Sequence, residues 1–232
     1  MPFADALMLD SGRLSDVEAA RALGFVGGLT TNPTLTIAGL APDAAPTEDR
    51  LIAHVAELAA ASPPGPVFAQ PFTSEPERAE EQARALGAIA PDRMVIKLVA
   101  TNEFAGVASR LRDDGFACAL TGVFSAGQAL CAHQLGCAWI IPYVDRAARA
   151  ATGRDDMVAA LARVLASVDS STRIVAASVK TLDQVVRSLE DGADAVSVPL
   201  GVLEQLCEHP LSRAALTAFD DAVPGPWVGS EH

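Results

Sequence analysis

The chain has 232 residues, of which 50% are hydrophobic and 20% charged, and its formal net charge is −12 at pH 7. This length suits one sizeable domain, and the acidic balance argues against nucleic-acid partners, which need a basic surface to displace counterions. Because no window approaches the roughly 18 unbroken apolar residues of a membrane span, and the N-terminus lacks the basic region of a signal peptide, we expect a cytoplasmic protein with no membrane partner.

Apolar runs of strand length alternate with helical patterns eight times along the chain. The predicted strands are 5–9, 25–29, 66–71, 93–99, 116–120, 137–142, 173–177 and 194–198. The predicted helices, in which apolar residues recur three or four positions apart, are 15–23, 47–61, 76–89, 102–114, 125–135, 153–168, 181–190 and 199–207. Helical crossovers between buried strands indicate a parallel sheet. The α/β pattern therefore favours a single-domain (β/α)8 TIM barrel over residues 1–209, with a doubly wound open sheet as the alternative.

Two segments fall outside this repeat. Residues 39–47 are the longest irregular stretch, which predicts a surface loop. Leu211, Ala215 and Phe219 recur every fourth position, which predicts one more helix within the C-terminal segment 210–232. The end of that segment, from Val223 onward, is expected to be loose unless a neighbouring subunit holds it.

Polar residues follow the predicted strands at their C-terminal ends, where barrels carry out their chemistry. Each of the first seven strands ends in a group able to form hydrogen bonds or transfer protons. These groups are Asp10, Thr30, Thr31, Asn32, Gln70, Lys97, Thr121, Tyr143 with Asp145 and Arg146, and Ser178 with Lys180. A barrel built for stability alone has no need of them, so this end is the predicted active site.

Lys97 stands out because its strand, from Met94 to Val99, is otherwise aliphatic. Of the seventeen basic residues only Lys97 and Lys180 are lysine. Burial disfavours an ammonium group and makes a neutral amine available to attack a carbonyl, which arginine cannot do. The alternative is a structural lysine that reaches solvent from the strand end or pairs with a carboxylate such as Asp10.

The other strand-end groups are individually ambiguous. Tyr143, the only tyrosine, is either catalytic or an aromatic side chain with its hydroxyl in water. Arg146 either holds a phosphate through its planar fork or lies on the surface near Asp145. Ser178 and Lys180 open the seventh strand–helix loop, where a helix N-terminus offers an anion site, and Asn32 could simply form a local turn.

Several classes of site lack their signatures. None of the four histidines follows a strand, and the four cysteines lack the close pairs of a zinc site, so we expect no metal. There is no GxGxxG or GxxxxGKS, the usual dinucleotide and P-loop signals, and we expect no cofactor.

In combination these motifs resemble the transaldolase family, and within it the fructose-6-phosphate aldolase-like subgroup. The resemblance covers nearly the whole chain. It is carried by LMLDSG (7–12), GLTTNPTL (28–35), VFAQ (67–70), VIKLVAT (95–101), LTGVFSAGQAL (120–130), PYVDR (142–146), AASVKT (176–181) and ADAVSVPLGVLEQL (193–206).

The resemblance implies a role for each matched residue. Lys97 would be the Schiff-base lysine, with Asp10 the acidic residue of strand one. Gln70 and Thr121 would position the water used in imine chemistry. The substrate would be bound by Asn32 with its neighbour Thr31, and its phosphate by Arg146, Ser178 and Lys180.

Two positions separate the subgroups. Transaldolases proper usually carry Glu where this chain has Gln70 and Phe where it has Tyr143, so Gln with Tyr indicates the aldolase side. The acid–base group would be Asp10 or Tyr143. The chain departs from the family in having Val99 where proline is frequent, in the VFSAGQ end of the fifth strand motif, and in a longer 39–47 loop, which leaves acceptor or donor specificity open.

The implied activity is that of a metal-independent class I aldolase or transaldolase acting on a small-molecule sugar phosphate such as fructose 6-phosphate. One alternative is a true transaldolase of the pentose phosphate type, which uses sedoheptulose 7-phosphate and glyceraldehyde 3-phosphate. Others are a relative acting on a differently charged ketose and a non-catalytic sugar-phosphate-binding barrel. The family also implies a ring-shaped homo-oligomer, a pentamer or decamer, in which the helix containing Leu211, Ala215 and Phe219 packs on a neighbour.

Overall fold

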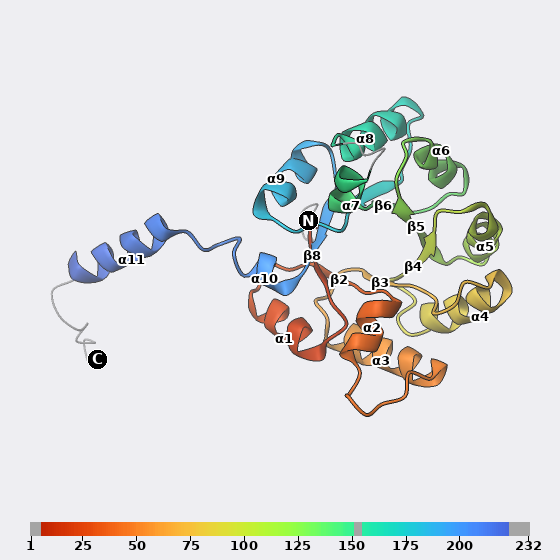
Figure 1. Ribbon diagram of the computed structural model, residues 1–232, viewed down its shortest axis with the longest axis horizontal. Helices are drawn as coiled ribbons and strands as arrows, with labels where there is room; N and C mark the ends of the chain where they lie inside the picture. The colour runs from red at the N-terminus through yellow and green to blue at the C-terminus, as the bar shows by residue number, and fades with distance from the viewer. Residues whose placement is uncertain (1–5, 151–154, 223–232) are drawn as a thin grey trace, which may run out of the picture.

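The computed structural model describes residues 6–150 and 155–222 and contains a closed barrel of eight parallel strands (Figure 1). Each strand pairs with the next along the chain, and β8 closes the ring on β1. The strands are β1 (Leu7–Asp10), β2 (Gly28–Thr30), β3 (Val67–Ala69), β4 (Met94–Val99), β5 (Ala117–Val123), β6 (Trp139–Pro142), β7 (Arg173–Ala176) and β8 (Ala195–Val198). The predicted (β/α)8 barrel is confirmed, and the open sheet is excluded.

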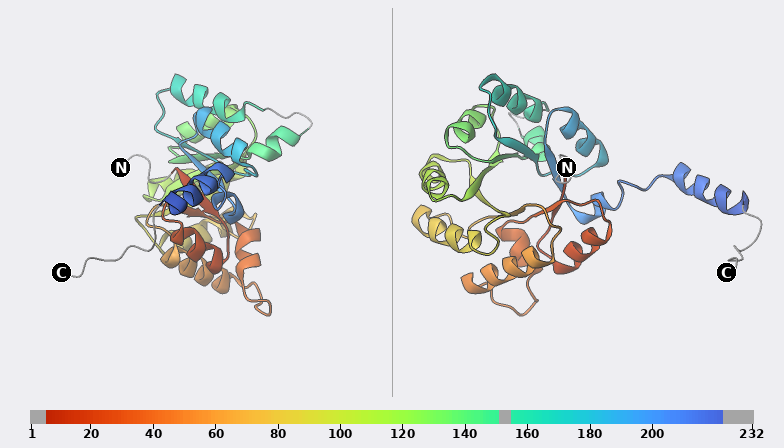
Figure 2. Two further views of the ribbon diagram at one scale, coloured as in Figure 1. Left: turned by 90° about the vertical axis from the view of Figure 1, so that its left-hand side faces the viewer. Right: turned by 180° about the vertical axis from the view of Figure 1, so that it is seen from behind.

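Helices surround the barrel on its outside (Figures 1 and 2). They are α1 (Leu14–Ala22), α2 (Pro33–Gly39), α3 (Glu48–Ala61), α4 (Pro76–Gly87), α5 (Asn102–Asp113), α6 (Gly127–Gln134), α7 (Val144–Arg149), α8 (Met157–Ser167), α9 (Leu182–Glu190) and α10 (Leu200–Leu203). The last helix along the chain, α11 (Pro210–Ala222), does not belong to this ring. Residues 153 and 154 of the predicted sixth-unit helix, residue 5 of the first predicted strand and the tail after Ala222 lie outside the described residues.

Two short helices, α2 and α7, are absent from the sequence prediction. In α2, Pro33 occupies the first turn, and the Asn32 side chain accepts a hydrogen bond from the Leu35 N–H at 3.0 Å. Proline at this position favours a helix start, because its missing N–H would have no intrahelical partner there. Pro33 lies three residues after the end of β2 and begins the helix.

Strand ends differ from prediction by a few residues. The third strand ends at Ala69, so Gln70 and Pro71 follow it, and the second strand runs over Gly28–Thr30 and not over 25–29. Strand β5 continues to Val123 and changes register against β6 between Thr121 and Val123, with Gly122 at φ 67°. This left-handed conformation is one that glycine adopts without strain.

The barrel has two apolar layers, as alternation along each strand requires. Side chains on one face of the strands pack against the helices. Those on the other face fill the barrel interior with Met8, Phe68, Val95, Ala119, Trp139, Ile141, Val175 and Ala195. Two residues after most of these, the same inward face presents Asp10, Gln70, Lys97, Thr121, Tyr143 and Ser197. The interior is therefore apolar up to the C-terminal mouth and polar at it.

Helix α11 stands away from the barrel (Figures 1 and 2) and has no buried residue. Its apolar side chains include Leu211, 73% exposed, and Phe219, 68% exposed. None of the helices among the described residues is long and apolar enough to cross a membrane.

Candidate active site

Lys97 is enclosed by the barrel, with 4% of its surface exposed. It faces inward because it lies two residues after the interior residue Val95. Burial lowers the pKa of Lys97 from 10.5 to about 8, and the nearby Asp10 carboxylate opposes part of that fall. At pH 7 roughly a tenth of such a group is a neutral amine, against well under a thousandth at the ordinary pKa. The structural alternative of a lysine that reaches bulk water is wrong.

A polar cavity of about 110 Å³ opens beside Lys97 at the C-terminal mouth. The strand-end groups named from the sequence that line it are Asp10, Thr30, Lys97, Thr121, Tyr143, Arg146, Ser178 and Lys180. Eight residues from six strands and the segments that follow them, those of β1, β2, β4, β5, β6 and β7, thus surround one space, as their strand-end positions predict.

Two hydroxyls, one of them that of Thr30, form a chain to Asp10 within this cavity. Thr30 Oγ1 donates to Asp10 Oδ1 at 2.8 Å and lies 2.5 Å from Ser197 Oγ. Both Thr30 and Ser197 are buried. Ser197 was not identified from the sequence, although a lone hydroxyl in the apolar run Ala195–Val198, two residues after an inward-facing alanine, carries the same signal as Lys97.

Tyr143 lies between Thr121, near Lys97, and the cation Arg146. Thr121 Oγ1 donates to the Tyr143 hydroxyl at 3.3 Å, and the Arg146 guanidinium lies 4.9 Å from the centre of the Tyr143 ring. Asp145 forms an ion pair with Arg149. Among the described residues Arg146 has no carboxylate partner, so its charge is available to a ligand.

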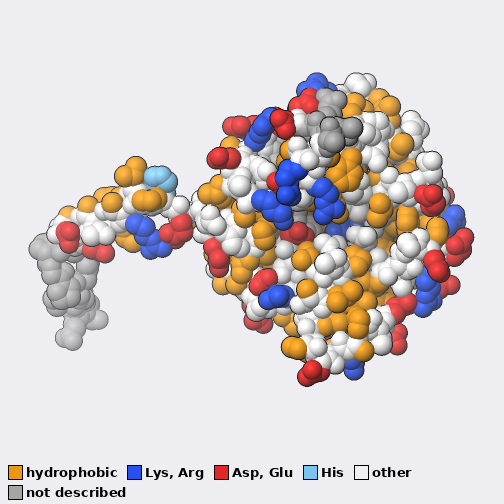
Figure 3. All heavy atoms as spheres, viewed as in Figure 1, with side chains coloured by type: hydrophobic (Ala, Val, Ile, Leu, Met, Phe, Trp, Pro, Cys, Tyr) orange, Lys and Arg blue, Asp and Glu red, His pale blue; other side chains and the backbone are white. Residues whose placement is uncertain are grey.

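The outer part of the cavity suits an anion. Lys180 is exposed and, within the described parts of the chain, forms no ion pair. Ser178 has a φ of 59°, a conformation that residues other than glycine rarely adopt and that the surrounding structure must hold in place. Figure 3 shows Lys and Arg side chains gathered near the middle of the face that Figure 1 presents. Local positive charge thus coexists with the negative charge of the whole protein.

Asn32 and Thr31 do not line this cavity. The Asn32 side chain caps α2, and Thr31 Oγ1 lies 3.0 Å from Thr36 Oγ1 within that helix. In this structure both side chains hold α2 against the end of β2.

Gln70 lies at a second cavity, of about 270 Å³, that also reaches Lys97. The described residues contain no group of three or more His, Cys, Asp or Glu side chains arranged to hold a metal ion. The groups that are present provide a partly neutral amine, a carboxylate, a phenol, hydroxyls and two unpaired cations. Such a set can form a covalent bond to a carbonyl carbon, move protons around it and hold an anionic end of the same molecule.

Comparison with known proteins agrees with this geometry. A sequence model of the family described as Transaldolase/Fructose-6-phosphate aldolase matches residues 7–224. A protein named probable transaldolase from Thermus thermophilus is 31% identical over 214 residues, 92% of this chain and 95% of that relative. Proteins of the same name from Prosthecochloris aestuarii and Chlorobium phaeobacteroides are 30% and 32% identical, covering 91% of this chain and 94% and 92% of theirs.

Proposed function

Because this chain belongs to the transaldolase/fructose-6-phosphate aldolase family, we propose that it is a Schiff-base aldolase that cleaves a ketose phosphate such as fructose 6-phosphate. The observation that carries the proposal is the position of Lys97: it is buried, has a pKa of about 8 and borders a cavity that combines proton-transfer groups with two cations. A structural lysine requires none of these neighbours.

The reaction begins at the Lys97 amine, which attacks the C2 ketone and forms a carbinolamine. Loss of water gives the iminium, and Thr121 and Gln70 position the water that carries the protons. Both residues border Lys97, one in each cavity. Arg146, Ser178 and Lys180 hold the terminal phosphate, so that remote binding energy orients the reacting carbon.

Cleavage breaks the C3–C4 bond, whose electron pair moves into the iminium and leaves an enamine on Lys97. The C4 hydroxyl loses its proton to Asp10 or to Tyr143, and the aldehyde phosphate departs. Asp10 accepts a hydrogen bond from Thr30, while Tyr143 contacts Thr121. Protonation of the enamine at C3 and hydrolysis then release dihydroxyacetone and regenerate the amine.

Borohydride trapping tests this proposal directly. Incubation with fructose 6-phosphate and borohydride should attach a reduced three-carbon or six-carbon adduct to Lys97, located by peptide mapping. Since the chain has only two lysines, Lys97→Met should abolish the adduct, whereas Lys180→Met should still form it on Lys97 but require a higher concentration of fructose 6-phosphate, because a phosphate-binding cation is lost. An adduct on Lys180, or none at all, would overturn the mechanism.

Transaldolase activity is the second candidate, favoured by the relatives named probable transaldolase. In that reaction the enamine attacks a second aldehyde and is not protonated. We favour cleavage because Gln70 and Tyr143 stand at the two subgroup positions. Gln70→Glu should then raise transfer relative to cleavage. If the native protein already transfers efficiently to erythrose 4-phosphate, the subgroup assignment is wrong.

We also propose that α11 packs on a second copy of the chain in a homo-oligomer. The support is a helix whose apolar side chains, including Leu211, Leu216 and Phe219, are all exposed. Light scattering after gel filtration should give a mass of several chains for the full protein and a smaller one for Leu216→Glu combined with Phe219→Glu. A monomeric native protein would refute this.

A further inference from the structure

We propose that Gln184 is a positioning residue of the anion site: it holds the segment that follows β7 against the segment that follows β6, and so determines how strongly the enzyme prefers a phosphorylated substrate. This inference rests on the proposed function, because Ser178 and Lys180 lie on the first segment and Arg146 on the second. Gln184 does not line the polar cavity, so it acts only through these residues.

The Gln184 side chain uses both groups of its amide. Its Oε1 accepts the Lys180 N–H at 2.7 Å, and its Nε2 donates to Asp145 Oδ1 at 3.4 Å. Asp145 belongs to α7 and directly precedes Arg146. One side chain therefore joins the two segments that carry the cations of the site. A glutamate could not do so, because its carboxylate has no donor for Asp145.

The segment after β7 requires such support, because Ser178 has a φ of 59°. A residue other than glycine keeps this conformation only where the surrounding structure imposes it. The Asp145 N–H donates to the Ser178 carbonyl at 3.3 Å, the next side chain, Val179, is 1% exposed, and Gln184 accepts the Lys180 N–H. The first restraint is backbone and the second is core packing, so the Gln184 contact is the one that a substitution can remove selectively.

The start of α9 shows that this side chain supports the loop. Thr181 is the N-cap of α9 and accepts the Gln184 N–H at 3.2 Å. In a complete capping box, the side chain three residues after the cap accepts in turn the N–H of the cap residue. Here the Gln184 side chain accepts the N–H one position earlier, that of Lys180. It therefore fixes the anion-site segment and not the helix end.

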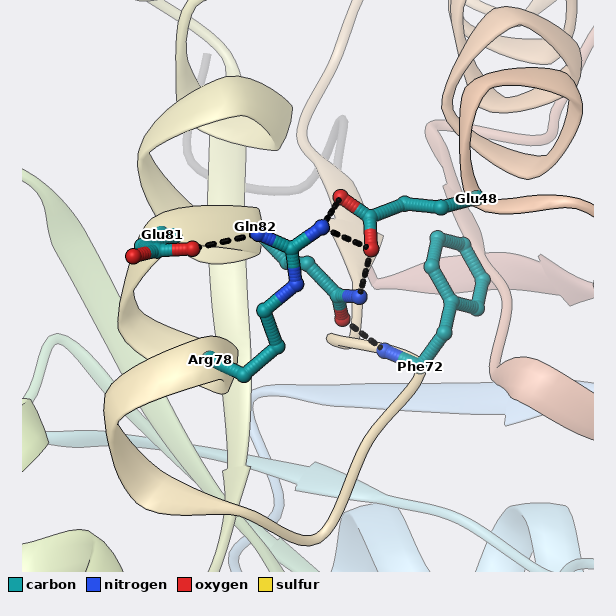
Figure 4. A network of polar contacts seen from close by, with 5 residues as sticks. All are labelled: Glu48, Phe72, Arg78, Glu81 and Gln82. Atoms are coloured by element: carbon teal, nitrogen blue, oxygen red, sulfur yellow. Dashed lines mark hydrogen bonds and ion pairs between the residues drawn. The ribbon is translucent and has the colours of Figure 1, made fainter.

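Two other glutamines hold the loops after β3 and β5 in the same way. Gln82, on α4, joins the loop after β3 to Glu48 of α3 (Figure 4). Gln128, on α6, joins the loop after β5 to the Ala100 carbonyl, which follows β4. In all three cases Oε1 accepts a loop N–H and Nε2 donates to the preceding strand–helix unit. Neither of these two loops contributes a cation to the polar cavity, so both glutamines are matched controls for Gln184.

The preference for a phosphorylated aldehyde tests this role in the full-length protein. Dihydroxyacetone at a fixed concentration is added to glyceraldehyde 3-phosphate or to glyceraldehyde, and kcat/KM is measured for each aldehyde. Gln184→Met keeps the length and the neutral charge but removes the amide. The ratio of phosphorylated to unphosphorylated kcat/KM should therefore fall by roughly threefold to tenfold, the effect of one lost hydrogen bond. Gln184→Asn keeps the amide but is too short to reach both partners, so it should lower the ratio as well.

The ratio does not depend on the amount of folded enzyme, so a loss of stability alone leaves it unchanged. Gln82→Met and Gln128→Met should keep the native ratio. The inference is overturned if both Gln184 variants keep the native ratio, or if the two controls lower it as much.

The proposed function fails separately. If the native protein converts neither aldehyde, and dihydroxyacetone with borohydride leaves no adduct on Lys97, the Schiff-base mechanism is wrong. A native ratio near one contradicts the phosphate site and, with it, the role of Gln184. An adduct on Lys97 and a native preference for phosphate that both Gln184 variants retain refute the role of Gln184 alone.

Discussion

Replacing Lys97 by methionine should stabilise the protein at neutral pH while abolishing activity. The buried amine has a pKa of about 8 when folded, against an ordinary 10.5. Each unit of pKa corresponds to about 1.4 kcal/mol, so keeping the ammonium in the folded barrel at pH 7 costs roughly 3 kcal/mol. Methionine has a similar length and suits an apolar strand. Because its introduction also deprives Asp10 of a neighbouring cation, we expect a net gain of about 1–3 kcal/mol in the free energy of unfolding.

The pH dependence of this gain has a definite sign. Between pH 8 and 10.5 the unfolded chain still binds the lysine proton and the folded chain has released it. The free energy of unfolding of the native protein therefore rises with pH across this window relative to that of Lys97→Met. The electrostatic part of the variant's advantage should shrink from roughly 3 kcal/mol at pH 7 to roughly 1 kcal/mol at about pH 10.

Urea unfolding followed by circular dichroism at both pH values, at one fixed protein concentration, measures the difference. Lys180→Met is the matched control: Lys180 is exposed, so its removal should give no comparable stabilisation. The reasoning fails if Lys97→Met is no more stable than the native protein at pH 7, or if its advantage does not decrease at the higher pH.

Three further changes probe the surroundings of the site. Asp10→Asn removes the charge that raises the pKa of Lys97, so the pH at which borohydride inactivation with hydroxyacetone becomes half-maximal should fall; a shift to higher pH contradicts this. Gln82 accepts a hydrogen bond from the Phe72 N–H and donates one to Glu48, and so anchors the Phe72 loop to α3 and α4 (Figure 4). Gln82→Leu removes both hydrogen bonds and should cost about 1–3 kcal/mol in urea unfolding, whereas Glu81→Gln, at the exposed ion pair with Arg78, should change stability far less; equal effects would refute the anchoring role. Gly12→Ala places a Cβ 2.0 Å from a backbone oxygen of α2 and should lower stability by about 2 kcal/mol or more; a melting temperature like that of the native protein would show that α2 moves freely.

Much of the fold was predictable because the sequence shows both strand-length apolar runs and segments in which apolar residues recur three or four positions apart. Buried strands alternating with amphipathic helices leave a parallel barrel as the favoured architecture. Asp10, Lys97 and Thr121 were predicted because polar residues at the C-terminal ends of barrel strands lie at the mouth, and the structure places each of them two residues beyond an interior apolar residue. Ser197 has the same spacing from the interior residue Ala195, but it lies within β8 and its small hydroxyl is common in buried strands.

Other features depend on contacts that residue order does not contain. Helix α2 has only seven residues, too few to show a helical spacing of apolar residues, and the Asn32 side chain is its N-cap. The second cavity beside Lys97 depends on Phe72, which follows β3, and Phe104, which belongs to α5, because both line it. These residues come from separate loops and helices, so their meeting is a consequence of closure of the barrel.

The position of α11 has a consequence for how the protein is made. Every strand of the barrel precedes α11 in the sequence, and α11 contributes no buried residue to it. The barrel can therefore complete its core while α11 is still within the ribosome, since domains generally fold as units in the order of synthesis. If α11 is the element that joins one copy to another, assembly is postponed until a finished barrel exists, and unfinished chains lack the means to associate.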